Sequence, residues 1–92
     1  MEKYSRISKL TEEYLNGVLG NLKMNYSKEN ELQVSIEYED QNHYWFDYEI
    51  AIDLAKKKVA SAIHQSEGHL NKIPLRRKQT FELALQNIIV NS

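Results

Sequence analysis

Apolar residues follow two patterns along the chain: a helical spacing towards each end and a strict alternation in the middle. The alternation is clearest from Tyr44 to Leu54, where even-numbered residues are aromatic or aliphatic and most odd-numbered residues are polar. A period of two, rich in aromatic and β-branched residues, predicts a strand with one buried face. Leu32–Tyr38 repeats the pattern, and the turn-forming segment Asp40–His43 joins the two runs. We therefore expect an antiparallel hairpin.

Helical spacing near the amino terminus predicts a first helix over Ser5–Met24. Thr11–Glu13 could also mark the start of this helix, with Ser5–Leu10 as a separate turn. Gly17 and Gly20 lie inside the predicted helix, where each glycine costs about 1 kcal/mol relative to alanine. The two glycines either make the helix merely weak or bare a face that another element can approach closely.

The segment Ala55–Gln65 fits two interpretations. As a third strand, it would have Lys56–Lys58 near a turn and would point Val59 and Ile63 inward. As a helix, it would be capped by Asp53, but three lysines in its first turn would oppose the helix dipole. We favour the strand.

A second helix is predicted from Pro74, because proline suits the first helical position. The polar segments Asn25–Asn30 and Ser66–Ile73 are predicted connectors. The second helix would bury a stripe formed by Phe81, Ala84, Leu85, Ile88 and Ile89. The fold expected is therefore an α+β domain in the order helix, three-stranded antiparallel meander, helix (αβββα), with both helices on one face of the sheet.

The composition fits one domain spanning residues 1–92, since 41% of the residues are hydrophobic and 27% are charged. Cysteine is absent, which excludes disulfides, thiolate catalysis and cysteine-based zinc sites. No apolar run approaches the roughly 20 residues of a membrane span, and the first residues lack the apolar stretch of a secretory signal. We expect a cytoplasmic protein without membrane contact. The abundance of Lys, Asn, Ile and Glu is typical of AT-rich bacterial or phage genomes.

Charge is divided between two halves of the chain, although the net charge is −1. Residues 29–53 hold eight acidic residues and no Lys or Arg, whereas residues 56–78 hold seven Lys or Arg and one Glu. The odd-numbered positions of the hairpin place much of the acidic half on the solvent face, around Trp45. This is also what an ordinary solvated sheet face looks like, but tryptophan is enriched in interface hot spots. The predicted partner-binding residues are Trp45, Glu37, Glu39, Asp47 and Glu49, with Ala51, Ala60 and Ala62 as a small apolar island beside Trp45.

The basic residues suggest an alternative site. Arg76, Arg77 and Lys78 lie at the start of the last helix, where backbone amides and cations together suit a phosphate. The order helix, three strands, helix resembles that of the double-stranded-RNA-binding domain, which has basic residues at that place and a histidine in the loop between its first two strands, as His43 is here. The resemblance implies nucleic-acid binding, and we assign it to Lys57, Lys58, Arg76, Arg77, Lys78 and His43. Because the loop before His43 is acidic, we rank this hypothesis second.

Catalytic chemistry has little support in the sequence. The three histidines lack the spacing of an HExxH metal motif, and only His64 and His69, near Glu67, could loosely hold a metal; we interpret all three as surface residues. No glycine-rich phosphate loop or nucleophile motif is present. We therefore expect no catalytic residue, no metal and no cofactor. The favoured function is a small non-enzymatic protein-interaction module, of the kind that phages and plasmids encode as regulators, inhibitors or accessory subunits. Its partner would be another protein or a second copy of itself, as a homodimer.

Overall fold

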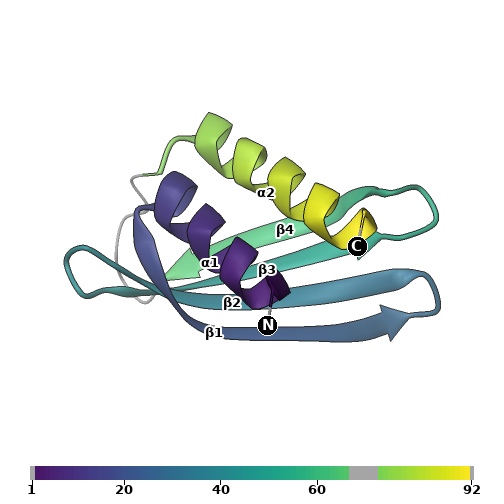
Figure 1. Cartoon of the computed structure of the whole chain (residues 1–92), viewed down its shortest axis with the longest axis horizontal. Helices are drawn as coiled ribbons and strands as arrows, with labels where there is room; N and C mark the ends of the chain where they lie inside the picture. Colours follow the sequence, from purple (N-terminus) through teal and green to yellow (C-terminus); the bar gives the residue numbers. More distant parts are fainter. Residues whose placement is uncertain (1, 67–72, 92) are drawn as a thin grey trace.

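The computed structural model describes residues 2–66 and 73–91, and this part of the chain forms two helices and four strands. In chain order they are α1 (Glu2–Leu15), β1 (Gly17–Lys28), β2 (Glu31–Asp40), β3 (Trp45–Asp53), β4 (Lys58–Ser66) and α2 (Leu75–Val90). The strands make one antiparallel sheet in the order β1-β2-β3-β4, and both helices lie on one face of it (Figure 1). The α+β class is confirmed, but the predicted three-stranded αβββα arrangement is wrong by one strand.

The additional strand lies where the first helix was expected to continue. α1 ends at Leu15 because Asn16 has a φ of 54°, the left-handed conformation that often follows a helix. The chain continues as β1, which includes most of the predicted connector Asn25–Asn30. Alternation in β1 is broken by a register shift between Leu19 and Asn21, so that Leu19 and Leu22 both pair with inward-facing residues of β2. Leu19 and Leu22 are therefore three residues apart, which is also the spacing of residues on one face of a helix.

The predicted glycine-bared helix face does not form, because Gly17 and Gly20 lie in β1; both glycines instead allow close approach by side chains of β2 and β3. A Cβ atom on Gly17 would lie 2.5 Å from Cδ2 of Tyr38. A Cβ atom on Gly20 would overlap the indole ring of Trp45. At each glycine an aromatic ring therefore packs directly against the backbone.

The predicted hairpin is confirmed as β2 and β3, which pair in register from Glu31 with Asp53 to Glu39 with Trp45. The inward-facing residues of both strands are buried against the helices, except that Tyr44 precedes β3 and is exposed. These buried residues are Leu32, Val34, Ile36, Tyr38, Phe46, Tyr48, Ile50 and Ile52. They join Ile7, Leu15, Phe81 and Leu85 of the helices in one core.

The strand interpretation of residues 55–65 is confirmed by β4, but the direction expected for one side chain is wrong. Ser61 pairs with Ala51 and Val59 pairs with Ile52, so Ala60 is an extra residue in the ladder. A bulge of this kind reverses the alternation. Val59 therefore packs against the core, as predicted, whereas Ile63 points to the opposite face and is 53% exposed.

α2 begins at Leu75, and Pro74 is its N-cap instead of its first helical residue. Of the predicted stripe, Phe81, Leu85, Ile88 and Ile89 are buried, while Ala84 is only partly buried. The guanidinium of Arg77 donates a hydrogen bond of 2.6 Å to the carbonyl oxygen of Glu13, so the start of α2 lies at the end of α1 and the two helices run antiparallel (Figure 1). In the described residues, no helix is long and apolar enough to span a membrane.

Candidate functional site

The sheet face that the helices leave uncovered carries the predicted partner-binding residues; we call it the outer face. Pairing between β2 and β3 sets Glu37 directly opposite Asp47, and Glu39 opposite Trp45. Glu49 lies opposite Ser35, further along the same face. The structure therefore brings together the residues that sequence alternation placed on this face.

Trp45 lies on the outer face at the first position of β3, opposite Glu39 near the end of β2. Its side chain is 51% exposed, and its ring extends across β2 to Gly20 on β1. Val18 pairs with Glu39, which pairs with Trp45, so the three residues form one row across β1, β2 and β3. Val18 is 62% exposed. A half-exposed indole held in place by backbone contact loses little conformational entropy when a partner covers it.

The predicted apolar island has other members than expected. Ala51 is on the outer face but buried, while Ala62 pairs with inward-facing Ile50, and Ala60 is the extra residue at the bulge of β4. Val18 and Gly20 take their place beside Trp45. Both belong to the segment that had been predicted as helix, so sequence reasoning could not place them in the site.

The four predicted carboxylates differ in how much of their hydrogen-bonding capacity the fold uses. Glu49 accepts hydrogen bonds from Ser35 Oγ (2.6 Å) and Gln33 Nε2 (2.9 Å), so it is largely engaged in holding β2 to β3. Glu37 and Asp47 are exposed and, in residues 2–66 and 73–91, make no hydrogen bond or ion pair. Directly opposite like charges repel, and a cation placed between them would relieve that repulsion.

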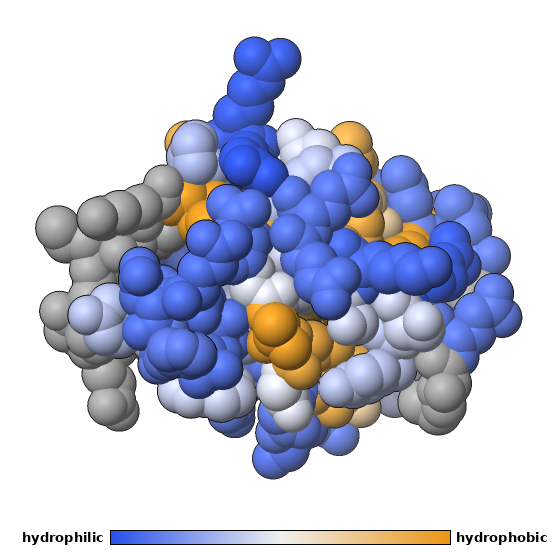
Figure 2. Space-filling view, turned by 60° about the vertical axis from the view of Figure 1, so that its left-hand side comes forward, coloured by the Kyte–Doolittle hydropathy of each residue, from blue (hydrophilic) through white to orange (hydrophobic). Residues whose placement is uncertain are grey.

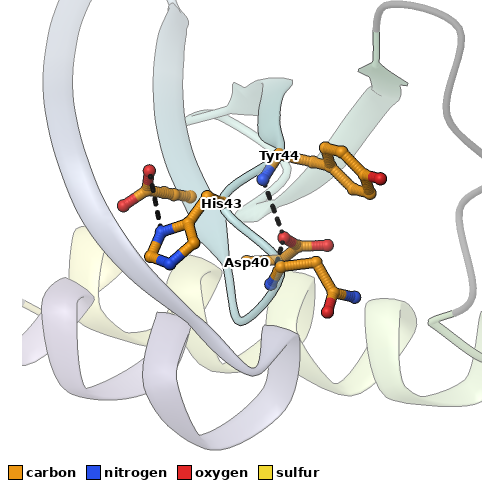
Figure 3. A network of polar contacts seen from close by, with 5 residues as sticks. Asp40, His43 and Tyr44 are labelled. Atoms are coloured by element: carbon orange, nitrogen blue, oxygen red, sulfur yellow. Dashed lines mark hydrogen bonds and ion pairs between the residues drawn. The ribbon is translucent and has the colours of Figure 1, made fainter.

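The loop between β2 and β3 is fixed by one carboxylate. Asp40 Oδ1 accepts hydrogen bonds from the backbone N–H groups of Asn42 and Tyr44, each 2.9 Å long (Figure 3). His43 takes the left-handed conformation (φ 67°), and its Nδ1 lies 3.5 Å from Oε2 of Glu39. The neighbour of His43 is thus an acidic residue of the outer face, Glu39, and not a basic surface.

A groove with a cavity volume of about 300 Å³ lies beside the outer face. It is lined by Glu12, Asn16, Gly17, Val18, Glu39, Asp40 and Gln41. Val18 and Glu39 belong to both the groove and the row that contains Trp45, so the two features are continuous. Figure 2 turns the left-hand end of Figure 1 towards the viewer, and the surface seen there is mostly hydrophilic, with small separate apolar areas.

The predicted basic site is not assembled. Val59, next to Lys58, donates its N–H to the side chain of Gln86 near the end of α2, whereas Arg76–Lys78 lie in the first turn of that helix. At a rise of about 1.5 Å per residue, some 13 Å of helix separates the two groups. Arg77 also binds the end of α1. Lys58 therefore lies near the end of α2, whereas Arg76–Lys78 lie at its start.

One predicted surface histidine is part of the core layer. His64 stacks on Tyr38 and Phe46, with ring centroids 5.8 and 5.4 Å apart, and its Nε2 lies 2.5 Å from the hydroxyl of Tyr38. Burial, and secondarily the charge of Lys78, lowers the pKa of His64 to about 4. The other two members of the loose metal site, Glu67 and His69, lie outside the described residues.

A second tyrosine joins this cluster from β3. The hydroxyl of Tyr48 donates a hydrogen bond to Glu82 of α2, and burial together with this bond raises the pKa of Tyr48. Burial and the charge of Asp40 raise the pKa of Tyr38. The cluster ties α2 to the sheet. Within the described residues, no group of three His, Asp or Glu side chains could hold a metal ion.

Lowering the pH should destabilise the fold partly through His64. Its folded-state pKa of about 4 lies below the ordinary value of 6.5, so the unfolded chain is protonated first. The stability contributed by the neutral imidazole is present above pH 6.5 and is lost as the pH falls towards 4. Urea denaturation of His64→Gln should show a flatter pH dependence in this range than wild type or exposed His43→Gln. Equal slopes in all three proteins would contradict this role.

Comparisons of the chain with protein-family models, curated proteins and solved structures find no match.

Proposed function

We propose that this protein is a non-enzymatic binding module whose outer face docks onto another protein, at a place where that protein presents an apolar side chain surrounded by Lys and Arg. The observation that carries the proposal is the half-exposed ring of Trp45, resting on Gly20 in a field of carboxylates. Tryptophan is among the residues most enriched in interface hot spots, which lie in apolar centres with polar surrounds.

The charge of the outer face supports the choice of a basic partner. Glu37 and Asp47 face each other and, among the described residues, form no ion pair; the groove next to Val18 adds Glu12 and Asp40. Lys or Arg from a partner would pair with these carboxylates, speed association and disfavour acidic competitors. Two copies meeting through this face would oppose like charges, so we favour a different protein as the occupant.

The proposal is tested by selection from a random 12-residue peptide library displayed on phage, with the full chain immobilised. We expect the enriched peptides to combine an aromatic or aliphatic residue with flanking Lys or Arg. Binding of these peptides should weaken as salt rises, because exposed charge pairs are screened. Enriched peptides without an excess of basic residues would overturn the proposal.

Matched charge reversals locate the binding site. The double variant Glu37→Lys, Asp47→Lys changes the outer face, whereas Glu2→Lys, Glu29→Lys makes the same change in net charge at exposed positions of α1 and the β1–β2 turn. The first variant should lose the selected peptides and the second should retain them. Equal loss in both would show that only net charge matters.

A further inference from the structure

β1 is an edge strand with backbone groups directed away from the sheet. The N–H of Asp40 bonds to the carbonyl of Tyr44, and that of Leu54 bonds to the carbonyl of Asn30, so even-numbered residues of β2 point their backbone groups towards β3. Odd-numbered residues of β2 then bond to β1. In β1 the residues opposite them, including Lys23 and Asn25, direct their backbone N–H and C=O groups towards β2. The alternate residues Leu22, Met24 and Tyr26 direct their backbone groups to the open edge.

Between two register shifts, at Leu19/Asn21 and at Tyr26/Lys28, the middle of this edge lacks the usual protection against strand pairing. Register with β2 is regular from Asn21 to Tyr26, with no bulge, no proline and one charged residue, Lys23. At the other edge of the sheet, Gln86 of α2 accepts the N–H of Val59 and so covers part of β4. Beside the open edge of β1, Tyr26 is 73% exposed although it lies on the helix-bearing side of the sheet.

We propose that a second copy of this chain pairs with β1, so that two sheets join into one through antiparallel β1 strands. With Met24 opposite Met24 of the second copy, Leu22 falls opposite Tyr26 of that copy, and all three residues exchange their outward backbone groups. On the outer face, Lys23 falls opposite Asn25. The register that pairs Leu22 with Met24 would instead set Lys23 opposite Lys23, which is repulsive.

The pairing is self-complementary in chemistry as well as in geometry. Leu22 and Met24 are partly buried and apolar, and the exposed ring of Tyr26 gains an aliphatic neighbour from the other copy. One short strand pair is small for a protein interface, so the dimer should be weak and depend on concentration. In such a dimer both outer faces lie on the same side of the joined sheet, which would let the dimer bind two sites at once.

Two measurements on the full chain test the proposal. Sedimentation equilibrium gives the average mass, and NMR gives the rate of amide hydrogen exchange at low and high protein concentration. We expect the average mass to rise towards that of a dimer, and exchange at Leu22, Met24 and Tyr26 to slow as it rises. The amides of Lys23 and Asn25, already in the ladder with β2, should change little. A monomeric mass up to about 1 mM, or a dimer without slowed exchange at these three amides, would overturn it.

Charge variants at one outer-face position test the register. Asn25→Lys places a lysine opposite Lys23 of the second copy, twice per dimer, and should raise the dimer Kd about two- to thirtyfold. Asn25→Glu should lower the dimer Kd, and Asn21→Lys, which would face Ser27 of the second copy, should change it far less. Trp45→Ala should leave the dimer unchanged, which separates this proposal from binding at the outer face. Equal dimer Kd values for Asn25→Lys and Asn25→Glu would overturn the register.

Discussion

Replacing Trp45 with alanine is expected to raise the Kd of the selected peptides at least about 30-fold. Truncation of a hot-spot side chain costs about 2 kcal/mol or more of binding free energy. Half of the ring is already exposed and the other half rests on Gly20, so the free energy of unfolding should fall by only about 1 kcal/mol. Binding is measured by calorimetry and stability by urea denaturation. A loss of stability above about 3 kcal/mol would instead assign Trp45 to the core.

Two further variants separate the position of the ring from its presence. Gly20→Ala puts a methyl group where the indole now lies, so the ring must turn away while its chemistry is kept. We expect Gly20→Ala to bind the selected peptides with an affinity between those of wild type and Trp45→Ala. Tyr4→Ala removes a partly exposed aromatic ring from α1, in the other layer of the molecule, and should bind like wild type. Equal losses in Tyr4→Ala and Trp45→Ala would mean that peptides bind exposed aromatics without regard to place.

Among the variants proposed, Phe81→Ala is expected to lower the free energy of unfolding most, by about 3–5 kcal/mol. Phe81 is fully buried and stacks on Tyr48 with ring centroids 5.4 Å apart, next to the hydrogen bond between Tyr48 and Glu82. The cavity would therefore loosen the contact between α2 and the sheet. A domain of this size has a total stability of about 5–15 kcal/mol, so the variant should unfold at markedly lower urea concentrations.

The control for Phe81→Ala is Leu83→Ala on the same helix. Leu83 is exposed, and leucine and alanine have similar helix propensities, so its loss should change stability by less than about 0.5 kcal/mol. Similar urea midpoints for the two variants would contradict the packing of α2 described above.

The sequence predicted the hairpin and α2 well because each is long, periodic and uninterrupted. It failed on β1 because the irregularity at Gly20 changes the spacing between Leu19 and Leu22 from two to three, which is the spacing of a helix. The direction of Ile63 failed for the same physical reason, an extra residue at Ala60. Bulges are decided by pairing with a neighbouring strand, and a single sequence does not show the neighbour.

The candidate binding face was predictable in part. Trp45 and the carboxylates of β2 and β3 follow from alternation alone, and their register follows from the short loop between the strands. Two facts needed the fold: that Glu49 is held by Ser35 and Gln33, and that Gly20 supports the indole ring. The separation of Lys58 from Arg76 likewise depends on the direction in which α2 crosses the sheet.

Fluorescence of the chain's single tryptophan, recorded during titration with a selected basic peptide, reports whether the peptide covers Trp45. If a partner covers the outer face, the emission of Trp45 should move to shorter wavelength and become less accessible to acrylamide as the peptide saturates the protein. Unchanged emission and unchanged acrylamide quenching at saturation would place the peptide elsewhere on the molecule and contradict the account.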